Sequence, residues 1–133
     1  MELDVSRYID IPFVEKGRDM SGCDCWGLFY LVYRDLLDIE LPLYLDTYQN
    51  TEDEKVLGAV IKGEIVKWTR VSVKNLRVGD GVSIRLKGQP MHVGVYIGNG
   101  KFIHCLAGSG TVIEKVNSIT WRNRIVGYYR YER

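Results

Sequence analysis

The amino-acid sequence predicts an α+β fold in which helices come first and an antiparallel sheet of about five or six strands follows. Three observations support this prediction. Before residue 64, one long segment has the 3.6-residue apolar period of a helix. After residue 64, the pattern changes to short runs rich in Val, Ile and Tyr, which favour strands. No repeat, low-complexity stretch or Pro/Gly/Ser linker divides the chain, so we expect one domain over residues 1–133.

The clearest helix is expected from Asp24 to Leu37. Its apolar residues recur on one helical face, and they are Cys25, Leu28, Phe29, Val32 and Leu36. Ser21 or Asp24 can cap this helix, because short polar side chains accept hydrogen bonds from the free N–H groups of a first turn. A second helix is expected from Thr51, where T-E-D-E has reciprocal-capping spacing, to Gly63, which favours a helix end.

Short strands are predicted in the second half of the chain, where β-branched and aromatic residues alternate with turn residues. In chain order they lie near Ile65–Thr69, Gly81–Leu86, His92–Ile97, Lys101–Cys105, Thr111–Glu114 and Ile125–Tyr131. Gly98-Asn99-Gly100 interrupts this pattern and is a strong hairpin signal.

Charge and hydropathy argue against several classes of protein. The chain has 18 Lys and Arg against 17 Asp and Glu, and nucleic-acid binding normally requires a positive excess. The charged N-terminus has no apolar signal core, and no run of about 18 apolar residues could span a membrane. We therefore expect synthesis in a cytoplasm without a signal peptide, and neither a nucleic acid nor a membrane as partner. In such a chain, three cysteines argue against a disulfide framework.

Cys25 is the candidate nucleophile. A nucleophilic cysteine needs a thiolate, a base that accepts its proton and a third group that orients the base. In a first helical turn, unpaired N–H groups and the positive end of the helix dipole favour the thiolate. Cys23 lies about 200° away around a helical wheel, so the two sulfur atoms are expected to point in different directions.

His92 and His104, the only two histidines, flank the Gly98-Asn99-Gly100 turn. A two-residue loop would place them on opposite faces of the sheet. A three-residue loop places His104 opposite Gly94 and makes His92 its diagonal neighbour on the same face, roughly 7–8 Å away. A type I turn closed by Gly100 in the left-handed conformation, with a bulge, gives this register. We therefore predict the longer loop.

Two other interpretations use the same residues. Cys23, Cys25, His104 and Cys105 are zinc-ligand types, but structural zinc sites favour two to four residues between paired cysteines, and here there is one. We therefore expect no zinc site, and the nucleophilic chemistry expected of Cys25 needs neither a metal nor an organic cofactor. Cys25 could also be a buried structural cysteine, and the two histidines count against that interpretation.

Three motifs follow one another in the order and spacing of a known family. They are D-C-W-G-L at 24–28, L-R-V-G-D at 76–80 and M-H-V-G-V-Y-I-G-N-G-K-F-I-H at 91–104. They resemble the NlpC family of papain-like cell-wall cysteine peptidases, over nearly the whole chain. The resemblance implies a papain-like fold with N-terminal helices packed on the sheet. It also implies that Cys25 is the nucleophile, His92 the general base and His104 the group that orients the base.

The resemblance further implies hydrolysis of peptidoglycan stem peptides, typically between γ-D-glutamyl and a diamino acid. Trp26, the following G-L-F-Y-L-V-Y-R-D-L-L-D-I-E-L-P and the closing G-Y-Y-R-Y resemble the phage tail-assembly branch. They imply a phage or prophage tail-associated cell-wall hydrolase, incorporated into a phage tail with other tail proteins as partners.

Two residues depart from the family pattern. Phe13 stands where the family often has a Tyr whose hydroxyl is a candidate oxyanion donor, and one missing donor costs about 10²–10³ in rate. Trp26 stands where most bacterial members have Ser, and we expect it to make the pocket bulkier. Two alternatives follow: a structural tail-assembly module with a decayed hydrolase site, or an amidase or acyltransferase on the same scaffold.

Overall fold

The computed structural model describes residues 2–47, 54–65, 67–86 and 89–132. In chain order they form η1 (Ser6–Tyr8), β1 (Arg18–Asp19), β2 (Gly22–Cys23), α1 (Cys25–Leu36), α2 (Glu54–Ile65), β3 (Thr69–Val71), η2 (Val73–Asn75), β4 (Gly81–Leu86), β5 (Gln89–Gly98), β6 (Lys101–Leu106), β7 (Gly110–Lys115) and β8 (Ile125–Arg130). Neither described α-helix is long and apolar enough to cross a membrane.

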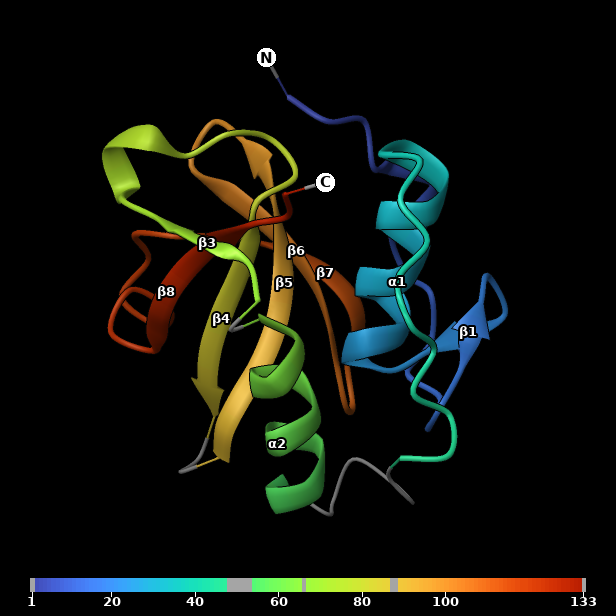
Figure 1. The fold of residues 1–133 in the computed structure, drawn as a ribbon. Helices are drawn as coiled ribbons and strands as arrows, with labels where there is room; N and C mark the ends of the chain where they lie inside the picture. Colours follow the sequence, from blue (N-terminus) through green and yellow to red (C-terminus); the bar gives the residue numbers. More distant parts are fainter. Residues whose placement is uncertain (1, 48–53, 66, 87–88, 133) are drawn as a thin grey trace.

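The strands form a six-stranded antiparallel sheet in the order β3-β8-β4-β5-β6-β7 and a separate two-stranded hairpin of β1 and β2. Helix α1 packs against β5 and β6, and α2 packs against β5 (Figure 1). The predicted α+β fold, with helices before an antiparallel sheet, is confirmed.

Alternate residues of the central strands contribute to two different apolar clusters, because successive strand side chains point to opposite faces. The cluster under α1 contains the odd-numbered residues of β5 and β6: Val93, Val95, Ile97, Ile103 and Cys105. The other cluster contains Val82, Ile84, Phe102, Trp121 and Tyr128. His92 and His104 have the parity of Phe102, so they share its face of the sheet.

The end of α2 differs from the prediction. The helix continues past Gly63 to Ile65, and β3 spans Thr69–Val71. The strand predicted near Ile65–Thr69 is therefore wrong except at Thr69. The Glu64 side chain is buried and accepts hydrogen bonds from the Trp68 indole and the Tyr44 hydroxyl. These tertiary contacts hold the last turn despite the glycine. The helix start predicted at Thr51 lies outside the described residues.

The register of the β5–β6 hairpin is the one that was predicted. Val95 is paired with Ile103, and extending that register places His104 opposite Gly94. A Cβ built on Gly94 would lie 3.3 Å from the His104 Cβ, which agrees with this placement. His92 is therefore the same-face diagonal neighbour of His104.

The turn that produces this register is of a different type from the predicted one. Asn99 and Gly100 both have positive φ, 52° and 72°, which a type I′ turn requires and a type I turn does not allow at its centre. The extra residue is accommodated by a register shift between Tyr96 and Gly98. A two-residue loop with a bulge beside it therefore produces the register that we expected from a three-residue loop.

Candidate active site

The N-terminus of α1 is held by a cluster of polar contacts around Asp24, which is fully buried. As the N-cap, Asp24 accepts hydrogen bonds from the Gly27 backbone N–H at 2.8 Å and the Lys16 backbone N–H at 3.0 Å. The Arg18 guanidinium forms an ion pair with the same carboxylate at 2.9 Å and also donates to the Leu43 carbonyl. This cap cluster fixes Cys25 as the first residue of the helix.

The Cys25 thiol is buried at the point where β5 and β6 separate. The last pair of these strands on this side is Val95 with Ile103, and the Cys25 thiol faces the backbone N–H of Val93, next to His92. Burial, together with the Asp24 carboxylate, raises the pKa of Cys25 to about 12. The backbone N–H groups of Val93 and Trp26 lower this pKa, but less.

This result corrects the expectation that the helix terminus alone favours a thiolate. The Cys25 side chain is desolvated. Placing a thiolate charge in this low-dielectric site is unfavourable by more free energy than the end of one helix contributes in its favour. The resting sulfur is therefore a neutral thiol, and it would have to lose this proton to act as a nucleophile.

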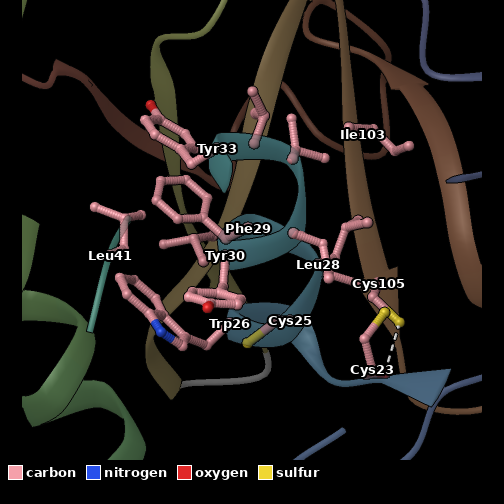
Figure 2. Packing of buried hydrophobic residues seen from close by; sticks show 14 of the residues in the cluster. Cys23, Cys25, Trp26, Leu28, Phe29, Tyr30, Tyr33, Leu41, Ile103 and Cys105 are labelled. Atoms are coloured by element: carbon pink, nitrogen blue, oxygen red, sulfur yellow. Dashed lines mark hydrogen bonds between the residues drawn. The ribbon is translucent and has the colours of Figure 1, made fainter. Parts of the chain in front are cut away.

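The other two cysteines form a separate group. The Cys105 thiol donates a hydrogen bond to the Cys23 carbonyl at 3.1 Å, and both side chains are fully buried. Figure 2 shows the Cys25 sulfur directed away from both, as we predicted for Cys23 and Cys25. In the part of the chain that the structure describes, no group of three or more His, Cys, Asp or Glu side chains could hold a metal ion.

His92 and His104 are hydrogen-bonded to each other. The His92 Nε2 atom lies 3.0 Å from the His104 Nδ1 atom, and the ring planes are 68° apart. Burial, and secondarily the charge of His104, lowers the pKa of His92 well below its usual value. Burial lowers the pKa of His104 to about 3. Both imidazoles are therefore neutral near pH 7, and only Nδ1 of His92 remains available to a thiol.

Glu114 on β7 is a residue that the sequence analysis missed. Its Oε2 atom lies 3.2 Å from the His104 Nε2 atom. Strand β7 pairs with β6 so that Glu114 is opposite Phe102, which makes it a diagonal neighbour of His104. The register of the β6–β7 hairpin would have indicated Glu114, but the sequence analysis derives only the register of the β5–β6 hairpin.

Trp26 and Phe13, the two departures from the family pattern, both make contacts that hold the fold together. The Trp26 side chain is fully buried, donates from Nε1 to the Pro42 carbonyl at 2.8 Å and stacks on Phe29. It therefore holds the segment after α1 and does not enlarge the wall of an open pocket, contrary to our expectation. Phe13 is half-buried, forms a β-bridge with Cys23 and has no hydroxyl to donate.

Comparison with known protein families gives one clear match. The family model described as the NlpC/P60 family matches residues 10–130. Murein DD-endopeptidase MepS/Murein LD-carboxypeptidase of Escherichia coli is 34% identical over 108 residues, which cover 81% of this chain and 49% of that protein. Gamma-DL-glutamyl hydrolase of Bacillus subtilis is 27% identical over 132 residues, which cover 97% of this chain and 28% of that protein. The chain thus spans about half, or less, of the length of these relatives.

Solved structures share the fold. An NlpC/P60 family protein from Bacillus cereus superimposes with a TM-score of 0.69 at 23% identity, over 93% of this chain and 36% of that chain. NlpC2 from Trichomonas vaginalis also gives a TM-score of 0.69 at 23% identity, over 96% and 44%. At these identities, the likeness establishes the papain-like α+β architecture.

Proposed function

The chain belongs to the NlpC/P60 family, and on that premise we propose that it is a cysteine endopeptidase that hydrolyses amide bonds of peptidoglycan stem peptides. The names of the relatives, murein endopeptidases and a gamma-DL-glutamyl hydrolase, support the substrate class. One observation carries the proposed chemistry. The hydrogen-bonded His92–His104 pair lies beside the strand position that the Cys25 thiol faces.

In the proposed first half-reaction, the Cys25 sulfur attacks the carbonyl carbon of the stem-peptide amide. Because burial keeps both groups neutral at rest, the thiol proton passes to Nδ1 of His92 as the S–C bond forms. His92 then gives this proton to the amide nitrogen, the C–N bond breaks, and the amine leaves. The acyl group remains on Cys25 as a thioester.

The second half-reaction restores the enzyme. His92 removes a proton from a water molecule, and the oxygen of that water attacks the thioester carbonyl. The C–S bond breaks, the carboxylic acid leaves, and Cys25 regains its proton. His104 keeps its hydrogen bond to His92 through both half-reactions and so fixes the ring that moves the proton.

The negative oxygen of each tetrahedral intermediate needs hydrogen-bond donors. Cys25 is the first residue of α1, where backbone N–H groups have no acceptor within the helix, so its N–H is the donor we propose. Phe13 supplies none. The rate is therefore expected to be lower than in a site with a second donor, by up to about 10²–10³.

Product analysis tests this proposal. The purified chain is incubated with peptidoglycan fragments of several stem-peptide types, and the products are identified by mass spectrometry. We expect a new amine terminus at the bond between γ-D-glutamyl and the diamino acid, no product with Cys25→Ala, and an unchanged result with a chelator. Cys105→Ala, which removes another buried thiol, is the matched control and should retain cleavage.

Four outcomes would contradict the proposal. Cleavage by Cys25→Ala would require another nucleophile, and inhibition by a chelator would require a metal. Failure of the unaltered chain on every stem-peptide type would favour the structural module with a decayed site. Products cut between glycan and peptide would instead identify an amidase on the same scaffold.

Association with a phage tail is a further part of the proposal. Its support is the resemblance of the sequence from Trp26 to Pro42, and of the closing G-Y-Y-R-Y, to the phage tail-assembly branch. Mass spectrometry of purified phage particles induced from the source cells is the direct test. Detection in tail fractions is expected, and detection only in the envelope of uninfected cells would contradict this placement.

A further inference from the structure

We propose that Glu114 is a positioning residue whose ionised carboxylate decides which ring nitrogen of each histidine carries the proton. In this arrangement, Nδ1 of His92, the ring nitrogen that does not bond to His104, is left unprotonated and can accept a proton. The inference rests on the proposed function for its consequence in catalysis, but its structural content can be measured without any substrate.

The geometry uses both ring nitrogens of His104. Its Nδ1 atom faces His92 Nε2 at 3.0 Å, and its Nε2 atom faces Glu114 Oε2 at 3.2 Å. His104 is fully buried, so in the intact packing its two ring nitrogens bond to these side chains and not to solvent. The three side chains therefore form a continuous row of hydrogen bonds across β5, β6 and β7.

An ionised carboxylate gives this row a single direction, because it accepts hydrogen bonds and cannot donate them. His104 must then carry its proton on Nε2 and present a lone pair at Nδ1. That lone pair accepts a hydrogen bond from the Nε2–H group of His92. The remaining nitrogen, Nδ1 of His92, is left unprotonated, which is the form that can take a proton from a thiol.

Protonation of Glu114 would reverse the whole row. A neutral carboxyl group can donate to Nε2 of His104, which then carries its proton on Nδ1 and donates to His92. His92 would hold its own proton on Nδ1, and its lone pair would face away from the thiol. A single charge at the solvent-facing end thus determines whether His92 is a base.

The surroundings of Glu114 favour this role. Its side chain is 25% exposed, so solvent reaches the end of the row, whereas His104 is sealed by the ring edges of Phe102 and Trp121 at centroid distances of 4.9 and 4.8 Å. The groups that face the carboxylate are His104 from β6 and the Trp121 side chain, which hydrogen-bonds to it. Burial raises the pKa of Glu114 above its usual value, and the Trp121 hydrogen bond lowers it by less.

NMR of the full chain with isotope-labelled nitrogen tests the inference, because the sequence contains only two histidines. Spectra that correlate ring nitrogens with ring protons distinguish a protonated from an unprotonated nitrogen. Near neutral pH we expect both histidines to be protonated on Nε2. Glu114→Gln should mix the two forms, because an amide can either accept from or donate to His104. Glu114→Asp retains the charge and should shift the populations back, and Glu132→Gln is the control for loss of one exposed carboxylate.

Kinetics provide the second measurement. Glu114→Gln should lower kcat by the fraction of molecules in which Nδ1 of His92 carries the proton, which is about twofold for an equal mixture, with KM nearly unchanged. The acid limb of the wild-type pH profile should be absent from Glu114→Gln. A purely structural role would lower activity without changing the protonated nitrogen or this limb.

The two proposals can fail separately. Identical protonation of both histidines in the wild type and Glu114→Gln, or a wild-type His92 protonated on Nδ1, would overturn the inference whatever the activity. The expected spectra in a protein that cleaves no peptidoglycan would leave the inference standing and refute the proposed function.

Discussion

Two carboxylates organise the two sides of the candidate site, and they do so in different ways. Asp24 is fully buried and adjacent in sequence to Cys25, and its ion pair with Arg18 belongs to the cap cluster. Glu114 reaches the site only through the registers of two hairpins, and its carboxylate forms hydrogen bonds with His104 and Trp121. The helix side therefore fixes the position of Cys25, the proposed nucleophile, whereas the inferred role of the sheet side is to fix which ring nitrogens carry protons. Substitutions on the helix side should mainly cost stability, and those on the sheet side should mainly cost chemistry.

Asp24→Ala should have the largest effect on stability. It removes the helix cap and leaves the Arg18 guanidinium, whose side chain is only 9% exposed, without its carboxylate partner. We expect the free energy of unfolding to fall by about 3–5 kcal/mol, measured by urea denaturation. Asp19→Ala, which removes an exposed carboxylate, should cost less than about 1 kcal/mol. Equal losses for the two variants would contradict a structural role for the cap cluster.

Acid should destabilise the fold through the sheet side. The pKa of His104 is about 3 in the folded chain, whereas an unfolded histidine titrates near 6.5, so between these values the unfolded chain binds more protons. Stability is complete above the unfolded value and falls with decreasing pH, by about 1.4 kcal/mol per pH unit for each such histidine. His92 adds to this slope. The raised pKa of Glu114 acts in the opposite direction, because its neutral form is favoured in the folded chain.

Urea denaturation at a series of pH values measures this slope. His104→Asn should reduce it by the share of one histidine, while retaining that of His92. A slope that is the same with and without His104 would show that acid acts elsewhere, for example on the helix side at Asp24.

Gly94→Ala should disturb the sheet side by a steric route. A Cβ at this position would lie 2.8 Å from the Ile103 carbonyl oxygen and 3.3 Å from the Cβ of His104. We expect a loss of about 1–3 kcal/mol in stability, together with a lower kcat, because His104 must move. Gly63→Ala in α2 is the control, since nothing lies within 4 Å of its added Cβ, and it should be neutral or stabilising by up to about 1 kcal/mol. A tolerated Gly94→Ala with full activity would contradict the close packing around His104.

Glu114→Ala should have the smallest effect on stability and thus give the sharpest contrast with Asp24→Ala. The carboxylate is partly exposed and its partner His104 is neutral near pH 7, so we expect a change below about 1 kcal/mol. Circular dichroism during thermal unfolding is a sufficient measurement. A loss as large as that of Asp24→Ala would mean that the two carboxylates have the same structural role.

Much of the fold could be predicted because the relevant signals are local. The apolar period of α1 and the Asp24 cap are contained in a dozen neighbouring residues, and β4 occupies Gly81–Leu86 as predicted. The errors occurred where tertiary contacts outweigh local preference. Buried Glu64 extends α2 past a glycine, and a bulge replaces the expected turn between β5 and β6.

The sequence by itself determined the α+β order of elements and the cap that places Cys25 at a helix start. It allowed two hairpin registers, and the bulge in the structure selects the one that brings His92 and His104 to one face. The elements and the allowed registers depend on spacing along the chain, which a period or a loop length expresses. Only the tertiary structure decided that the Cys25 thiol is neutral at rest, that Trp26 is buried, and that Glu114 completes the row behind the histidines. Desolvation and contacts between distant strands depend on what surrounds a group in space, so the spacing of residues along the chain does not predict them.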